Sequence, residues 1–569
     1  MNNMTLVQKN QKIEHFFCHD VIDIPKSITR LYILNLTLTM ANNNLTYEVP
    51  EGATERALRR YTSWLDSAKL DAKDHQLDGM QFCMDRELAT TTPCGAKGGI
   101  IADEMGLGKT ILMLGCIVSN FRGATGRKNT LVVLPPALLD QWISIFKQFL
   151  GHTPLVFHGK KVKDFNAEQL VNASVIVTTY GMISTGRKHA CPLWSIPFHR
   201  LIMDEAHHVR NTGTRAFCGA MKIKADIKWL VTGTPIQNNN TDLLALCTVL
   251  GLKNAFMANR ANIKEIIKTH LLRRTKKSVG IKLPELEEEL ITVPWASPEE
   301  EKLAKEIHSK ASFSGVSAEN VDAIIHILTN HPLPMLTRAR QTCVFPHLLH
   351  KAVHKMQLQG RLPPDINLGR IKTCSKATAI VKHINKRKFN GRRKIIFCHY
   401  RGEIDLLCGL LKNQGISVGT IDGRVSKRQR KNFLEYSVTK RQFTSVCKKW
   451  RENEFVFERL KGFLGPDVLV VQIQTACEGL NLQHFQEVYF TSPHWNPAVE
   501  DQSIARAHRI GQDEKVNVFR FVMQDFKTCS CGESNCKKEA HITIDSYCRM
   551  VQEKKRELCD IIKPESPSS

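Results

Sequence analysis

The chain has 569 residues, of which 42% are hydrophobic and 24% charged, so it is too long for a small disulfide scaffold and fits a globular protein with two or more domains. Its 80 Lys and Arg outnumber its 55 Asp and Glu, for a formal net charge of +25, which favours a polyanionic partner, although solvated surface lysines alone would also produce it. No run approaches the ~18 apolar residues of a membrane span, and the 18 cysteines are scattered, so we expect a reduced, intracellular protein with no membrane partner.

Residues 1–50 carry no motif and stay unassigned. From 51 to 280, short runs rich in Val, Ile and Leu alternate with helical stretches, as is typical of buried strands in a parallel sheet. The expected strands are IIA (100–102), LVVLP (131–135), SVIVTTY (174–180), RLIMDE (200–205) and WLVTGTP (229–235). Because ligands bind at the carboxyl ends of such strands, the polar residues that follow them are candidates for a functional site.

Residues 281–370 hold charged text such as SPEEEKLAKEIHSKA and no clear strand, which predicts a helical connector or protrusion. A second strand pattern occupies residues 371–560, with KIIFCHY (394–400), VGTIDG (418–423), DVLVVQI (467–473) and EVYFTS (487–492). The expected fold class is therefore α/β, with two lobes of parallel sheet joined by the helical segment. A basic stretch near 436–465 predicts a helical insertion, either a DNA-binding accessory or a solvated surface elaboration.

The stretch GGIIADEMGLGKT (98–110) combines a strand, a glycine turn and the start of an apolar helix. Gly106 and Gly108 would let backbone N–H groups face phosphate oxygens at the helix N-terminus. Lys109 would reach the β- and γ-phosphates, and the hydroxyl of Thr110 would bind Mg²⁺. Asp103 occupies the position at which the general phosphate-loop pattern has its first glycine.

Asp204 and Glu205 follow the apolar residues Leu201 and Ile202 at an expected strand end. A carboxylate at such a position can hold Mg²⁺ through water, and its neighbour can orient or deprotonate the attacking water. We therefore assign Asp204 to the metal and Glu205 to the water. An isolated Asp-Glu pair would usually be solvated charge, but this pair follows a phosphate loop.

With these two elements in place, the chain resembles the Swi/Snf-type branch of helicase superfamily 2, whose paired RecA-like lobes form a motor on double-stranded DNA. The resemblance covers residues 70–555. Its motifs, in the order of the family, are His75-Gln76 with Gly79, ADEMGLGKT (102–110), LVVLPPALLDQW (131–142), VIVTTYGM (175–182), DEAHHVRN (204–211), LVTGTPIQNN (230–239), LLRRTKK (271–277), RQTCVFP (340–346), KIIFCHY, IDGRVSKRQR (421–430), EGLNL (478–482), HWNP (494–497) and QSIARAHRIGQ (502–512).

The resemblance implies roles for individual residues. ATP would be bound by Gln76, which would recognise adenine, and by the loop Asp103, Glu104, Met105, Gly106, Leu107, Gly108, Lys109 and Thr110. The DEAH box would be Asp204, Glu205, Ala206 and His207. Coupling of the ATP site to DNA would involve Thr232, Gly233, Thr234 and Gln502. Arg506 and Arg509, three residues apart and so on one face of a helix, would be the arginines that the second lobe brings to the γ-phosphate.

DNA contacts are implied for Pro135, Pro136, Thr178, Thr179, Arg210, Asn211, Gly423, Arg424, Asn481 and Trp495. Such contacts would be made mainly to phosphates, so binding would be sensitive to salt and weakly specific for sequence. The chain departs from the family at Cys477-Glu478, where paired small residues are usual, and this places the coupling of the ATP site to DNA in question.

Three cysteines, Cys529, Cys531 and Cys536, precede His541 and would make a tetrahedral zinc site, although the spacing lacks the usual C-x2-C knuckle, and a surface loop with reduced thiols is the alternative. The function implied is a DNA-stimulated ATPase that uses ATP and Mg²⁺, translocates on duplex DNA and displaces bound proteins such as nucleosomes or transcription factors. A nuclear location, or a host nucleus for a compact viral member, would follow, with the cytoplasm otherwise. The alternatives are a strand-separating DEAH-like helicase and a non-enzymatic DNA-binding scaffold.

Overall fold

The computed structural model describes residues 47–560 apart from 93–94, 122–125, 127–128, 160–161, 163–164, 187–189, 237–239, 253–259, 311–332, 361–368, 370, 372–373, 427, 431–432, 434–465, 477–479 and 527–540. The unassigned N-terminal segment up to residue 46, the whole basic stretch near 436–465, and Cys477-Glu478 therefore lie outside the described residues. Within the described ranges, no helix has the length and apolar character needed to cross a membrane.

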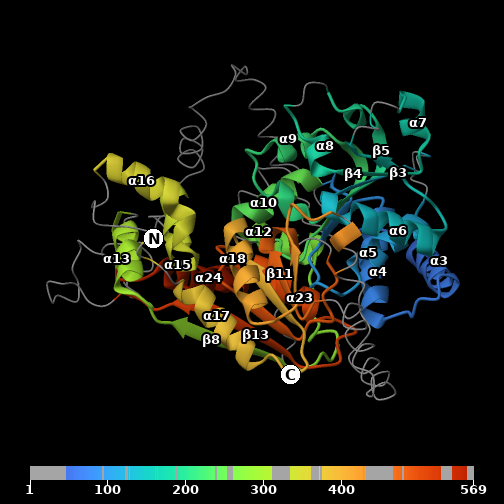
Figure 1. The fold of residues 1–569 in the computed structure, drawn as a ribbon. Coiled ribbons are helices and arrows are strands. Elements are labelled where there is room, and N and C mark those ends of the chain that lie inside the picture. Colours follow the sequence, from blue (N-terminus) through green and yellow to red (C-terminus); the bar gives the residue numbers. More distant parts are fainter. Residues whose placement is uncertain are drawn as a thin grey trace, which may run out of the picture.

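The first lobe is built on a sheet of seven parallel strands in the order β3-β4-β2-β5-β6-β1-β7 (Figure 1). The strands are β1 (Gly98–Ile101), β2 (Thr130–Leu134), β3 (Leu155–Phe157), β4 (Val175–Thr179), β5 (Pro197–Asp204), β6 (Lys224–Val231) and β7 (Leu271–Leu272). The helices are α3 (Ala53–Ser67), α4 (Asp74–Leu88), α5 (Lys109–Ser119), α6 (Leu139–Leu150), α7 (Ala167–Asn172), α8 (Tyr180–Ile183), α9 (Arg215–Met221), α10 (Asn240–Leu250) and α12 (Arg260–His270). Successive residues such as Val132 and Val133 enter different buried clusters, so both faces of the sheet are covered, which explains its unbroken apolar runs.

The second lobe has six parallel strands in the order β10-β11-β9-β12-β13-β8, and it packs below the first lobe in Figure 1. Its strands are β8 (Leu286–Val293), β9 (Lys394–Cys398), β10 (Val418–Ile421), β11 (Val468–Gln472), β12 (Glu487–Phe490) and β13 (Val516–Met523). Its helices are α13 (Pro298–Lys310), α15 (Leu333–Val344), α16 (His350–Leu358), α17 (Ser375–Lys386), α18 (Arg401–Asn413), α22 (Ile473–Ala476), α23 (Pro497–Ala507) and α24 (Ile544–Asp560). Each of the nine expected runs overlaps a strand, and the α/β class with two parallel sheets is confirmed.

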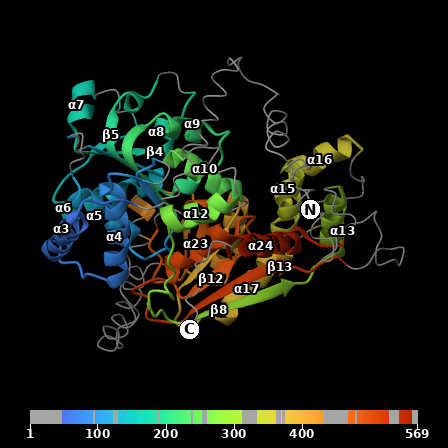
Figure 2. The same cartoon turned by 180° about the vertical axis from the view of Figure 1, so that it is seen from behind.

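Residues 281–370 differ from the expectation of a purely helical connector. Strand β8 pairs along its whole length with β13 and forms an edge of the second sheet, as Figure 2 shows from behind. The sequence LEEELITV did not predict this strand, because an edge strand is largely exposed and Glu287 to Glu289 interrupt the alternation of apolar residues. The helices that follow are as expected, but Leu303 of α13 and Ala339 of α15 enter a buried cluster with strands of the second sheet. This part of the segment thus packs as part of the second lobe.

Candidate active site

The turn between β1 and α5 is shaped by two glycines. Gly106 and Gly108 have φ values of 93° and 86°, in the left-handed region that residues with a side chain disfavour. A Cβ atom on Gly108 would also lie 2.3 Å from the Nε2 atom of Gln76, the residue expected to recognise adenine. The chain therefore turns tightly into the N-terminus of α5, where backbone N–H groups can receive phosphate oxygens.

Asp103 anchors this turn to a distant segment of the first lobe. Its carboxylate is 1% exposed and accepts hydrogen bonds from the backbone nitrogen and the Nε atom of Arg274, at 2.9 and 3.1 Å. The terminal nitrogen of Arg274 lies 2.5 Å from the second oxygen of Asp103, and the same guanidinium donates to the carbonyl of His75. The aspartate that replaces the first glycine thus joins the loop, the segment after β7 and α4. Sequence reasoning missed this role of Arg274.

Lys109 directs its amine back onto the loop. Its Nζ atom donates to the carbonyl of Asp103 at 2.7 Å and to that of Glu104 at 3.3 Å. Burial lowers the pKa of Lys109, and the negative charges of Glu205, Asp103 and Asp204 oppose that shift. The amine consequently lies among carboxylates and carbonyls at the place where a phosphate chain would enter.

Asp204 and Glu205 lie at the end of β5, as expected. The indole nitrogen of Trp142 and the backbone nitrogen of Glu205 donate to the carboxylate of Asp204, at 2.8 and 3.0 Å, and the hydroxyl of Tyr180 donates to its carbonyl at 2.7 Å. Glu205 has φ 51°, a left-handed conformation that costs a residue with a side chain about 1–3 kcal/mol and is typical of functional sites. Its carboxylate oxygen Oε2 lies 3.4 Å from the Nδ1 atom of His207.

The two carboxylates ionise at different pH. Burial and the neighbouring charge of Glu205 raise the pKa of Asp204 to about 6. Burial acts to raise the pKa of Glu205 as well, but the hydrogen bond with His207 and the charges of His207, Lys109 and Arg506 lower it to about 2. Glu205 therefore keeps its negative charge at neutral pH, whereas a cation beside Asp204 would favour the ionised form of that residue.

The donor set at this end of the sheet fits Mg²⁺. The described residues contain no group of three or more His, Cys, Asp or Glu side chains that would hold a metal ion by themselves. Mg²⁺ instead binds through one or two carboxylates together with water and substrate phosphates. Asp204 would offer the carboxylate, and Thr110 beside the loop would offer its hydroxyl.

Of the expected zinc ligands, Cys529, Cys531 and Cys536 lie outside the described residues and only His541 is described.

A short chain of contacts joins the DEAH box to β6. His207, in the 3-10 helix Ala206–Val209, has its Nδ1 atom 3.3 Å from the hydroxyl of Thr232. Thr232 is fully buried, and its hydroxyl accepts a hydrogen bond from the backbone nitrogen of Thr234 at 3.2 Å. A Cβ atom on Gly233 would lie 3.7 Å from the amine of Lys109. Three of the four residues expected to couple the site to DNA, Thr232, Gly233 and Thr234, thus form a segment that contacts both the DEAH box and the phosphate loop.

The second lobe brings Arg506 to the site. Asn496 caps α23, its side chain accepting from Ala498, and Pro497 occupies the first turn. Arg506 lies in the last turn, and its positive charge acts to lower the pKa of both Lys109 and Glu205, so it lies within electrostatic range of both groups.

Arg509 differs from the expectation that it shares a helix face with Arg506. Helix α23 ends at Ala507, His508 has the non-helical angles φ −90° and ψ 81°, and Arg509 lies in the turn that follows. The guanidinium of Arg509 donates to the side chain of Asn481 at 3.4 Å. The assumption of a continuous helix is therefore wrong, since the chain leaves the helix where the ring of His508 binds the carbonyl of Pro284.

Comparison with known proteins agrees with this arrangement. The SNF2-related domain matches residues 75–348, and the helicase conserved C-terminal domain matches residues 375–511. The chain belongs to the SNF2-related family.

Its relatives include the "Probable global transactivator" of Orgyia pseudotsugata multicapsid polyhedrosis virus, which is 25% identical over 81% of this SNF2-related chain and 88% of its own length. The "DNA excision repair protein ERCC-6-like" of Danio rerio is 26% identical over 79% of this chain but only 34% of its own length, so the chain spans about a third of that relative. Among solved structures, "Sulfolobus solfataricus SWI2/SNF2 ATPase core in complex with dsDNA" is 21% identical, covers 88% of this chain and 98% of its own, and has a TM-score of 0.35.

The residues of this SNF2-related protein that were expected to contact DNA fall into two groups. Pro136, Asn211, Gly423, Arg424 and Asn481 are exposed, and Arg210 is half-buried. Pro135, Thr178 and Thr179 are buried instead. The hydroxyl of Thr178 donates to the carbonyl of Phe157 at 2.8 Å, and that of Thr179 lies 3.2 Å from the Nδ1 atom of His158. The side chains of these two threonines therefore brace β4 against β3 rather than reaching the surface.

Trp495 is half-buried and packs against the hydrophobic core of the second lobe. The guanidinium of Arg340 lies 5.4 Å from the centre of its ring, and the ring of Tyr547 meets it edge-on at 5.7 Å. These partners belong to α15 and α24, so Trp495 joins two helices to the HWNP turn. Its expected place beside the DNA-contacting loops stays a prediction, and the packing of the ring on these two side chains is favourable because it removes apolar surface from water.

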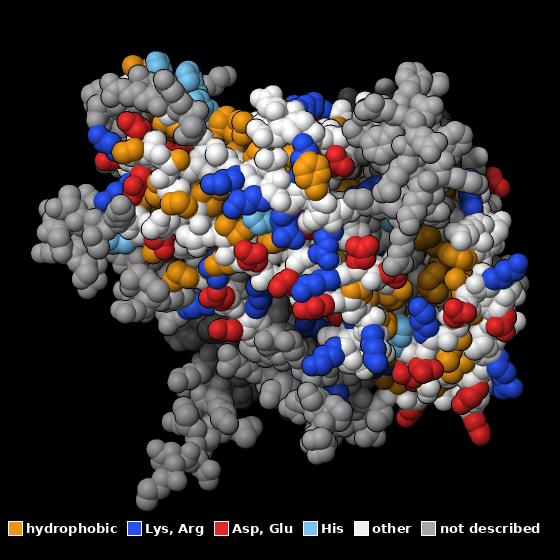
Figure 3. All heavy atoms as spheres, turned by 60° about the horizontal axis from the view of Figure 1, so that its bottom comes forward, with side chains coloured by type: hydrophobic (Ala, Val, Ile, Leu, Met, Phe, Trp, Pro, Cys, Tyr) orange, Lys and Arg blue, Asp and Glu red, His pale blue; other side chains and the backbone are white. Residues whose placement is uncertain are grey.

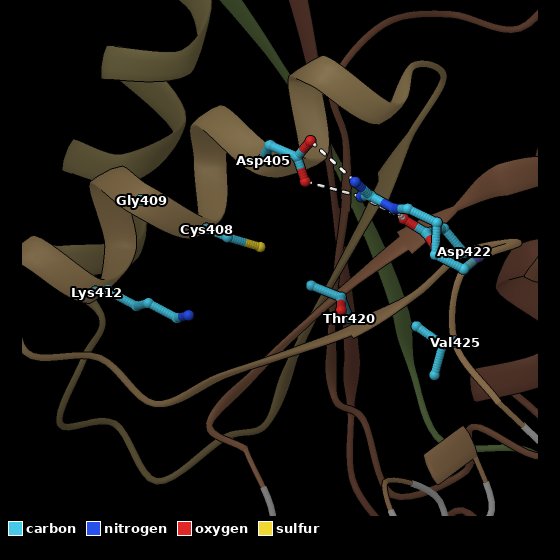
Figure 4. A pocket seen from close by; sticks show the side chains of 8 residues that line it. Asp405, Cys408, Gly409, Lys412, Thr420, Asp422 and Val425 are labelled. Atoms are coloured by element: carbon cyan, nitrogen blue, oxygen red, sulfur yellow. Dashed lines mark hydrogen bonds and ion pairs between the residues drawn. The ribbon is translucent and has the colours of Figure 1, made fainter. Parts of the chain in front are cut away.

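Arg424 is held by two carboxylates rather than pointing freely outward. Its guanidinium binds both oxygens of Asp405, at 2.8 and 3.1 Å, and lies 2.6 Å from Asp422. Figure 4 shows these groups at one side of a hollow of about 460 Å³ that Cys408, Lys412 and Thr420 also line. On the face drawn in Figure 3, Lys and Arg alternate with Asp and Glu, so the positive surplus does not form a single patch there.

Proposed function

We propose that this SNF2-related protein is a DNA-stimulated ATPase that moves along double-stranded DNA and displaces or remodels the proteins bound to it. The supporting observation is that one candidate ATP site draws on both lobes: Lys109 and the pair Asp204 and Glu205 come from the first, and Arg506 comes from the second. Hydrolysis then depends on how the two lobes are placed, and DNA that contacts both lobes controls the reaction through that placement.

Each residue of the site has a defined task in this proposal. Lys109 exchanges the carbonyls of Asp103 and Glu104 for the β- and γ-phosphates of ATP. Glu205 orients the attacking water, because its low pKa keeps it ionised at neutral pH and a carboxylate accepts a hydrogen bond from that water. Arg506 neutralises the charge that develops on the γ-phosphate, an effect worth about 10³–10⁵ in rate for arginine fingers. Thr110 and Asp204 would hold Mg²⁺, which would neutralise phosphate charge when bound.

Coupling to DNA runs through the contact between His207 and Thr232. The DEAH box and the segment 232–234 are joined by this hydrogen bond, and Gly233 packs against the loop that carries Lys109. A shift of either segment therefore changes the position of Glu205 relative to Lys109. The exposed residues Asn211 and Asn481 are the DNA contacts that we retain, one from each lobe.

The cellular setting of the proposal follows the names of the relatives. One is a viral global transactivator and another is an excision repair protein, so we propose a role in transcription, chromatin or DNA repair, in the nucleus or in the nucleus of a host cell. The bound proteins displaced would be nucleosomes or transcription factors.

The decisive experiment measures ATP hydrolysis with and without duplex DNA. We expect stimulation by duplex DNA in the wild type and loss of hydrolysis in Lys109→Ala and Glu205→Gln, with the exposed Lys147→Ala as the matched control. Removal of a third strand from duplex DNA would show translocation, and separation of the duplex itself would instead indicate a strand-separating helicase. If duplex DNA gave no stimulation and both variants matched the wild type, a DNA-binding scaffold with a silent site would replace the proposal.

A further inference from the structure

Lys276 lies between the two lobes and is almost completely enclosed. It belongs to the segment that leaves β7 and crosses to the second lobe, and its side chain is 8% exposed, whereas the neighbouring Lys277 is exposed. Backbone hydrogen bonds hold this segment beside the phosphate loop, from Ala102 to Leu272 at 2.7 Å and from Glu104 to Arg274 at 2.9 Å.

The side chain of Lys276 contacts three parts of the site. Its amine lies 3.1 Å from Glu104, whose other oxygen accepts the backbone N–H of Lys276 at 2.8 Å. Its Cε atom would be 3.7 Å from a Cβ atom on Gly106, so the aliphatic stem packs over the loop. From there the amine donates to the backbone carbonyl of His508 in the second lobe at 3.4 Å.

The contact between Lys276 and the carbonyl of His508 lies next to Arg506 in the chain. His508 is the second residue after Arg506, and its ring binds the carbonyl of Pro284 at 2.7 Å. The end of α23 is therefore held from two sides, by Pro284 of the crossing segment and by Lys276 at the phosphate loop. A separation of 3.4 Å is long for a hydrogen bond, and contacts of this kind tighten when substrate completes a site.

We propose that Lys276 is a positioning residue that sets Arg506 against the phosphate loop. The inference rests on the proposed ATPase function. If Lys276 were exposed, its ion pair with Glu104 would contribute little to holding the lobes in position, because solvent would screen the charges and the side chain would be mobile. The enclosed amine of Lys276 instead bridges a carboxylate of one lobe and a carbonyl of the other. It acts on the transition state through Arg506, without touching the phosphates.

The test compares Lys276→Met, Lys276→Arg and the control Lys277→Met in the full chain. Displacement of a catalytic group by about 1 Å lowers rates by up to about 10²-fold, so we expect Lys276→Met to lower kcat by about tenfold to a hundredfold. The KM for ATP should stay within about twofold, because Arg506 contributes to the transition state more than to ground-state binding. Lys276→Arg, which keeps the charge and the donors, should recover most of kcat, and Lys277→Met should match the wild type.

A second measurement does not depend on turnover. Amide hydrogen exchange over residues 502–512 should become faster in Lys276→Met, while exchange in β2 and β11 stays unchanged. If Lys276→Met folds poorly, Glu104→Gln should reproduce the kcat loss, because it removes the carboxylate charge that pairs with the amine of Lys276. Unchanged kcat together with unchanged exchange in Lys276→Met, or a raised KM with kcat preserved, would overturn the inference. Absence of DNA-stimulated hydrolysis in the wild type would overturn the proposed function instead, and the exchange experiment would still decide the role of Lys276.

Discussion

Replacement of Arg274 by Met tests whether Asp103 is a structural anchor of the phosphate loop. In the native protein the carboxylate of Asp103 is 1% exposed and is bound by the side chain and the backbone nitrogen of Arg274, and the same side chain also reaches the carbonyl of His75. Arg274→Met leaves that carboxylate with the backbone donor alone. The loop should then lose its link to the segment after β7.

The expected cost follows from the burial of the pair. Removal of one partner of a buried ion pair costs about 3–5 kcal/mol, because the remaining charge is left without compensation. Arg274 is 15% exposed and its backbone N–H still serves Asp103, so we expect the lower end, about 3 kcal/mol. For a unit as large as the first lobe, each kcal/mol shifts Tm by about 2–4 °C, which gives a decrease of about 6–12 °C.

Scanning calorimetry of Arg274→Met measures this decrease, with Lys277→Met as the control for loss of a nearby exposed cation. Asp103→Asn combined with Arg274→Met removes the uncompensated charge, so the double variant should be more stable than the sum of the single effects predicts. If Arg274→Met melted within about 2 °C of Lys277→Met, or if the two single effects simply added, the anchor role of Asp103 would be refuted.

The remaining predictions concern catalysis. Arg506→Ala should lower kcat by about 10³-fold or more with little change in KM for ATP, because the charge of Arg506 acts on the transition state. Arg509→Ala should have a much smaller effect on kcat and should weaken DNA binding, because Arg509 contacts Asn481. Steady-state kinetics and DNA titration measure these effects, and equal losses of kcat in the two variants would contradict the different roles of the two arginines. His207→Ala should reduce the ratio of DNA-stimulated to basal hydrolysis more than basal hydrolysis itself, because it removes the contact with Thr232; an unchanged ratio would show that coupling takes another route.

Local pattern was enough to place the catalytic groups along the chain. A strand, a glycine turn and an apolar helix identify the loop around Lys109 because phosphate binding at a helix N-terminus requires these residue types in this order. The pair Asp204 and Glu205 was recognisable because it follows an apolar run that is typical of a buried strand. Nine strands were predicted for the same reason, since strands that are covered on both faces consist of continuous runs of apolar residues.

Only the tertiary structure decided which residues meet. The sequence shows Asp103 as a replaced glycine, but its partner Arg274 is 171 residues away, and Lys276 reaches His508 across 232 residues. Thr178 looks in the sequence like any polar residue at the end of a strand, yet its hydroxyl donates a hydrogen bond to the carbonyl of Phe157 in the neighbouring strand. The physical reason is that residue type and spacing record the local backbone and its buried face, whereas ion pairs, hydrogen bonds and the end of a helix depend on what other segments bring to that place.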